Sequence, residues 1–106
     1  MAWIRTSQVF AGDMEALRAH IGRRVRTLTT ARHSGFDGVA LTLTDPVELP
    51  ADTQGFIANP WQDYVLIALP NNPGHFPNLD KLMRSGQFHL IAAKSTDFTR
   101  QFEIDI

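Results

Sequence analysis

The sequence predicts an α+β domain with two short helices and a mostly antiparallel sheet of about five to six strands. A curled or barrel-like sheet is an open alternative to a flat one. Short alternating or continuous apolar segments are separated by Gly, Pro and Asn, which is typical of short strands. Helical spacing of apolar residues occurs in two segments, near 13–21 and 79–85. Connections of hairpin length outnumber the long crossovers that parallel strands need. With 106 residues, one domain over 1–106 is expected.

The first third of the chain predicts a strand, a helix and a second strand. A short strand is expected over 2–6, and a helix over 13–21 with Asp13 as its N-cap and Gly22 after its end. The apolar stripe of this helix consists of Phe10, Met14, Leu17 and Ile21. The Val- and Thr-rich residues 24–31 alternate as a strand does.

The middle third predicts a turn-rich connection followed by three strands. Residues 32–38 are expected to form a turn-rich connection between two strands. In residues 39–45 apolar and polar or small side chains alternate, which predicts a half-buried strand with Val39, Leu41 and Leu43 on one face. Asp45-Pro46 is expected to end this strand, because proline cannot donate to a ladder. After a loop and a short strand near 55–59, the continuous apolar run 64–69 suits a central strand covered on both faces.

The last third predicts a capped helix and two further strands. Asn78 can cap the helix 79–85, and Gly86 can close it. Strands are expected over 87–94 and over 101–106, where Phe102, Ile104 and Ile106 share one face. A strand that runs to the last residue needs a neighbour, either in its own sheet or on another chain.

Composition points to a soluble cytoplasmic protein that does not enter a membrane. The sequence has no cysteine, which excludes disulfides and thiolate metal sites. The start lacks the apolar core and cleavage pattern of a signal peptide. The longest uninterrupted apolar run, from Val65 to Leu69, is far too short to span a bilayer.

Known catalytic and ligand-binding signatures are absent from the sequence. It contains no GxGxxG, GxxxxGK[ST], HExxH or GxSxG. The four histidines, at 20, 33, 75 and 89, are scattered and do not have the spacing of metal ligands, so we expect neither a metal nor a cofactor. An enzyme is not the main expectation. A small ribonuclease is the enzymatic alternative, with candidates Arg26, His33, Tyr64 and His89.

The net charge of −1 conceals an uneven distribution. Residues 1–33 carry six arginines and two acids, whereas residues 34–106 carry four basic residues and nine acids. If 24–31 is a strand, Arg24 and Arg26 share a face. A basic strip for nucleic acid or an acidic partner would comprise Arg18, Arg23, Arg24, Arg26, Arg32 and His33. The segment lacks the aromatic residues that single-strand binders use for base stacking, and its arginines could instead pair with downstream acids.

The main functional expectation is a non-enzymatic protein-interaction module, such as an adaptor, an inhibitor or a small subunit of an assembly. Such a protein needs no catalytic motif and binds a protein partner or itself. Candidate partner-binding residues are Trp61, because tryptophan is common in interface hot spots, and Phe102 and Ile104 on the terminal strand. Nucleic-acid binding through residues 18–33 is the alternative.

Overall fold

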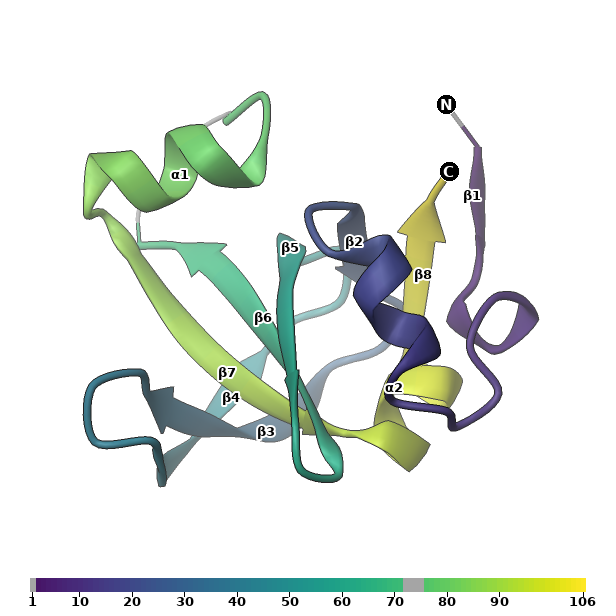
Figure 1. Ribbon diagram of the computed structural model, residues 1–106, viewed down its shortest axis with the longest axis horizontal. Helices are drawn as coiled ribbons and strands as arrows, with labels where there is room; N and C mark the ends of the chain where they lie inside the picture. Colours follow the sequence, from purple (N-terminus) through teal and green to yellow (C-terminus); the bar gives the residue numbers. More distant parts are fainter. Residues whose placement is uncertain (1, 72–75) are drawn as a thin grey trace.

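A computed structural model describes residues 2–71 and 76–106 and contains one antiparallel sheet with two α-helices (Figure 1). The strands of this described part are β1 (Trp3–Arg5), β2 (Arg24–Thr27), β3 (Ala31–Asp37), β4 (Thr42–Leu49), β5 (Gln54–Trp61), β6 (Tyr64–Pro70), β7 (Phe88–Lys94) and β8 (Phe102–Asp105). The helices are α1 (Leu79–Ser85) and α2 (Ser95–Gln101), with 3-10 turns η1 (Thr6–Gln8) and η2 (Ala16–His20). The antiparallel α+β architecture is confirmed. The expected five to six strands is too low, because the sheet has eight.

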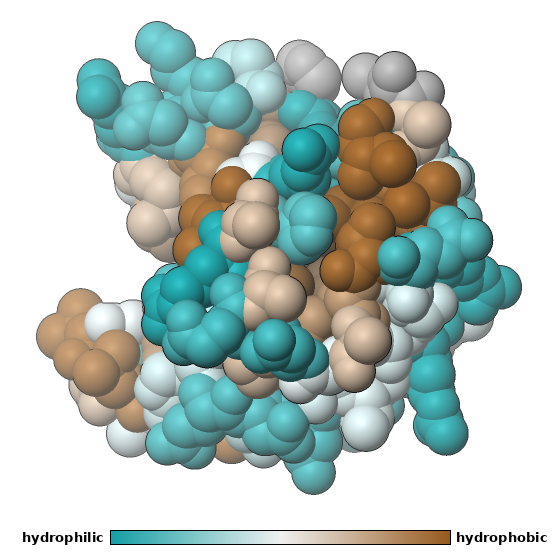
Figure 2. All heavy atoms as spheres, turned by 45° about the vertical axis from the view of Figure 1, so that its right-hand side comes forward, coloured by the Kyte–Doolittle hydropathy of each residue, from teal (hydrophilic) through white to brown (hydrophobic). Residues whose placement is uncertain are grey.

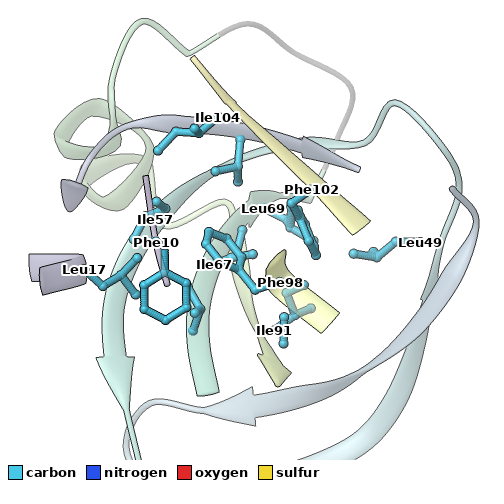
Figure 3. Close-up of a cluster of buried hydrophobic side chains, with 13 residues drawn as sticks. Phe10, Leu17, Leu49, Ile57, Ile67, Leu69, Ile91, Phe98, Phe102 and Ile104 are labelled. Carbon is cyan, nitrogen blue, oxygen red and sulfur yellow. The ribbon is translucent and has the colours of Figure 1, made fainter. Parts of the chain in front are cut away.

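The strands follow the order β1-β8-β2-β5-β6-β7-β3-β4, and the sheet curls around its core without closing. One apolar cluster draws side chains from both ends of that order, including Ile104 of β8 and Leu49 of β4 (Figure 3). The ring of His33 in β3 lies 5.4 Å from the ring of Phe102 in β8, although four strands separate β3 from β8 in the sheet. The face that surrounds this cluster is called the inner face below, and the opposite face the outer face.

The expected turn at 32–38 is wrong, because these residues belong to β3. The chain turns later, at 38–41, and β4 continues through Pro46. Proline is tolerated here because β4 is the last strand of the sheet and its pairing with β3 shifts register beside Gly35. A side chain at Gly35 would collide with the hydroxyl of Thr44, so glycine permits the close approach of the two strands.

The turn residues around Asn59 and Pro60 lie inside a long hairpin. The short strand expected at 55–59 extends to Trp61 as β5, and β6 begins after only two residues. Gln62 adopts φ 52°, the left-handed conformation of a tight turn. The predicted central strand is confirmed: residues 65–69 are buried in β6, between β5 and β7.

The two expected helices have different outcomes. The Oδ1 atom of Asn78 accepts a hydrogen bond from the backbone N–H of Lys81 at 2.9 Å, and Gly86 adopts a left-handed φ of 69°. Helix α1 therefore begins and ends as predicted. The helix expected over 13–21 shortens to the 3-10 turn Ala16–His20. The Asp13 carboxylate accepts a hydrogen bond from the backbone N–H of Glu15, two residues later. This contact forms a local turn instead of a helix cap. Helix α2 was not predicted, and it buries Phe98 in the inner core.

The terminal strand finds both neighbours within its own sheet. β8 pairs with β1 on one side and with β2 on the other. Phe102 and Ile104 are each only 1% exposed and belong to the inner core. Of the two expected kinds of neighbour, one in its own sheet or one on another chain, the structure shows the first. Among the described residues, no helix has the length and apolar character to span a bilayer.

Candidate functional site

Arg26 lies on the outer face of β2, as the alternation predicted, but an acid neutralises it. Its neighbours Val25 and Thr27 are buried on the inner face. The Nε and Nη2 atoms of Arg26 donate to Oε1 of Glu103 at 2.9 and 2.8 Å. The guanidinium carbon also lies 4.4 Å from the ring centroid of Trp3. This two-fold pairing fixes the side chain and leaves little free positive charge.

Arg24 shares the outer face and is held by other groups. Nη2 donates to the backbone carbonyl of Phe76 at 2.7 Å, and Nη1 lies 3.5 Å from the side-chain oxygen of Gln54. The guanidinium carbon is 4.9 Å from the ring centroid of Phe56. Arg24 thus covers a buried aromatic ring and keeps its position without an acid partner.

The other members of the expected basic strip do not extend this surface. Arg18 pairs with Glu15 at 3.2 Å, and both side chains are exposed. Arg23 is exposed just before β2, whereas Arg32 lies on β3, opposite Glu48 of β4. Acids therefore lie among the five arginines. The described residues do not form a continuous basic strip, and Arg26 is the member that pairs with a downstream acid, Glu103.

His33 lies in the core and not on the basic surface. It is 5% exposed and packs against Phe102. Burial lowers the pKa of His33 below its usual value, although the negative charge of Asp97 opposes the change. Its Nε2 atom has no hydrogen-bond partner among the described residues. A neutral imidazole in this position acts as a core side chain.

The four ribonuclease candidates make contacts with four different sets of neighbours. Arg26 contacts Glu103 and Trp3, and His33 contacts Phe102. Tyr64 packs on Trp61, and Nδ1 of His89 lies 2.8 Å from Oδ1 of Asn71. Within the described part of the chain, no hydrogen bond, ion pair or ring contact joins two of the four candidates. That part also contains no cluster of three potential metal ligands, and His75 lies outside it.

Trp61 is half-buried and closes a second apolar cluster, which is on the outer face. Its ring centroid lies 4.9 Å from that of Phe36 and 5.9 Å from that of Tyr64. Beneath these rings lie Leu66 and Ala92. Trp61 is therefore a wall of this cluster, with part of its surface still accessible.

The β3–β4 hairpin exposes a row of apolar side chains, which we call the hairpin tip: Val39, Leu41 and Leu43. Their exposed fractions are 96%, 58% and 40%. The sequence predicted that these residues face the core. The Asp37-Gly38 pair, a common hairpin turn signal, could have placed the turn at 38–41 and the tip outside the sheet.

Asp37 holds the turn at the hairpin tip. Its Oδ1 atom accepts from the backbone N–H groups of Val39 and Ala40 at 2.9 and 3.0 Å. These two hydrogen bonds lower the pKa of Asp37 below its usual value. Leu41 completes the turn at φ 56°, where a residue with a side chain is strained. In Figure 2 the apolar lobe at the lower left lies where Figure 1 places this turn.

Acidic residues lie along the hairpin that carries the tip. Between Arg32 and Lys81 the sequence has six acids and no lysine or arginine. Three of these acids, Asp37, Asp45 and Glu48, are exposed on the hairpin itself. Asp37 and Asp45 thus place negative charge near the apolar tip, whereas Glu48 lies at the far end of the hairpin, opposite Arg32.

Figure 2 also shows an apolar area at the upper right. Among the described residues, the exposed large apolar side chains outside the hairpin are Ile21, Met83 and Ile106, which are 40%, 43% and 49% exposed at three separate places along the chain. The hairpin tip differs because three such residues follow one another at alternate positions.

No protein-family model matches the chain, and neither the comparison with curated proteins nor that with solved structures gave a match.

Proposed function

We propose that this protein is a small protein-interaction module that docks a partner through the hairpin tip. The row of Val39, Leu41 and Leu43 carries the proposal, because consecutive exposed apolar side chains mark binding surfaces. A side chain that is 96% exposed contributes almost nothing to the folded core, so its apolar character serves no packing role within this chain.

The backbone at Leu41 supports the same proposal. A left-handed residue with a side chain costs about 1–2 kcal/mol relative to glycine. Glycine would remove this cost, and leucine instead adds exposed apolar area at the apex. A partner that covers Leu41 would offset the cost on binding.

The partner that fits is a protein segment with apolar residues flanked by lysine or arginine. Asp37 and Asp45 favour positive charge beside the tip and disfavour a second copy of the same hairpin, since like charges would meet. β4 is the last strand in the sheet order, so its free side can accept an added strand. Pro46 cannot donate to that strand, which keeps the backbone ladder short and leaves the tip as the main anchor.

Photo-crosslinking tests this proposal at single positions. Val39→benzoylphenylalanine in the source cells should capture a protein whose crosslinked peptide combines apolar residues with lysine or arginine. Met83→benzoylphenylalanine is the matched control, because Met83 is also an exposed apolar residue but lies on α1. The captured peptide is then synthesised and titrated against the purified protein. Leu41→Ser should weaken its binding at least about tenfold, as expected for an anchor residue, and Met83→Ser should not.

Any of the following outcomes would overturn the proposal. The first is equal capture from positions 39 and 83. The second is a captured peptide with net negative charge, or binding that Leu41→Ser leaves unchanged. The third is a crosslink to a second copy of this chain, which would replace the foreign partner with self-association.

A further inference from the structure

A depression of about 580 Å³ lies on the outer face, away from the hairpin tip. Side chains of β1, β2, β5 and β8 line it, together with Pro77. Strand register places these side chains on one face, because Arg24 pairs with Phe56 and Trp3 with Asp105. The volume is in the range of small-molecule sites.

The walls of the depression present flat surfaces. Trp3 contributes an indole ring, backed by the Arg26 guanidinium 4.4 Å from its centroid. The Arg24 guanidinium lies over the Phe56 ring at 4.9 Å. Indole rings and guanidinium planes are the surfaces on which unpaired bases stack in proteins. The sequence did not place an aromatic residue near Arg24 and Arg26, whereas the sheet brings Trp3 and Phe56 to them.

The polar lining supplies both donors and acceptors. Arg24 offers guanidinium N–H groups, Gln54 an amide, and Asp105 a carboxylate. Two of these groups are already positioned: Arg24 by the carbonyl of Phe76 at 2.7 Å, and Asp105 by the N–H of Ala2 at 3.1 Å. One cation and one anion line the depression, so the ligand part that enters it carries no large net charge. It is flat and has both kinds of hydrogen-bonding group along its edge.

We propose that this depression binds a nucleobase, presented either by a free nucleotide or by a single strand of nucleic acid. Guanine suits the lining, because it has acceptors at O6 and N7 for an arginine and an amino group for a carboxylate. This site differs from a phosphate-binding strip, since Glu103 and Asp105 disfavour a row of phosphates on the same face. The proposal is independent of the hairpin tip.

Chemical-shift mapping of the full chain tests the site. The probe is guanosine 5′-monophosphate, titrated to about 10 mM to detect dissociation constants near 1 mM. The indole N–H of Trp3 and the side-chain amide of Gln54 should shift, and the indole N–H of Trp61 should not. Ribose 5-phosphate, which lacks the base, is the matched ligand and should leave Trp3 unchanged. Short single-stranded oligonucleotides form the second arm.

Arg24→Lys should weaken binding at least about tenfold, because lysine keeps the charge but loses the planar stack and the fork. Gln54→Ala provides a second variant, and Arg23→Lys the control. Shifts with the nucleotide support a free ligand, and Trp3 shifts with oligonucleotides alone support a nucleic-acid strand. No shift with either, equal shifts with ribose 5-phosphate, or shifts that survive both Arg24→Lys and Gln54→Ala would overturn the proposal.

Discussion

Two halves of the outer sheet face cover their aromatic rings in different ways. Over β1, β8, β2 and β5, arginines cover the rings: Arg26 lies on Trp3, and Arg24 lies on Phe56. Over β6, β7 and β3, together with the end of β5, aromatic rings cover one another in the cluster of Phe36, Trp61 and Tyr64. We call the first of these the charged half and the second the apolar half.

This difference shows where the fold leaves apolar surface to a ligand. A guanidinium covers a ring yet keeps N–H groups for another molecule, so the charged half suits a small polar ligand. Among the described residues, no charged side chain covers the rings of the apolar half in that way, and the hairpin beside it carries the exposed tip. One sheet thus offers two kinds of binding surface, and three predictions test the contrast.

The largest effect is expected in the apolar half, from Trp61→Ala. Removing the half-buried indole uncovers Phe36 and Leu66, which should lower the free energy of unfolding by about 2–3 kcal/mol. Urea unfolding measures the change. Trp3→Ala in the charged half is the comparison and should cost about 1 kcal/mol, since a partly exposed ring and its stacked guanidinium are lost. An equal loss of unfolding free energy in Trp61→Ala and Trp3→Ala would contradict the contrast between the two halves.

A smaller effect is expected in the charged half, from Arg26→Ala. Loss of the Glu103 pair and of the Trp3 stack should lower the free energy of unfolding by about 1–2 kcal/mol. A double-mutant cycle with Glu103→Gln isolates the pair. Arg18→Ala is the control at an exposed ion pair and should change stability by less than about 0.5 kcal/mol. A coupling energy near zero between positions 26 and 103 would argue against a structural pair.

The smallest effect is expected on the inner face of the sheet, where the buried His33 makes the free energy of unfolding depend on pH. Burial holds the pKa of His33 below its usual value of 6.5, while Asp97 partly opposes this. Between the lowered pKa and 6.5, the unfolded chain binds a proton that the folded chain does not. The His33 contribution to stability is therefore full above about pH 6.5 and is lost as pH falls toward the folded pKa.

Denaturant titrations between about pH 5 and 7.5 measure this slope. His33→Gln should flatten it even if the variant is less stable at every pH, because glutamine does not titrate. His89→Gln, at an exposed histidine, is the control variant. The same slope in both variants would assign the pH dependence to other groups.

Local chemistry explains what was predictable. Asn78 and Gly86 specify the ends of α1 through bonds and dihedral angles within a few residues, so their role follows from neighbouring sequence. The alternation of residues 24–27 likewise fixes which side chains share a face once the segment is extended. The sequence by itself therefore determined the antiparallel α+β class, α1, the central strand β6 and the common face of Arg24 and Arg26.

The tertiary structure decided everything that depends on strand order. Pro46 stays inside β4 only because that strand lies at the end of the sheet, and the tail is buried because β1 and β2 flank β8. Glu103 reaches Arg26, and Trp3 and Phe56 reach the arginines, across strands far apart in the chain. The same holds for His33, which packs on Phe102 only because the sheet curls. Such contacts arise between residues distant in sequence, and no local pattern of side chains encodes which strand becomes the neighbour of which.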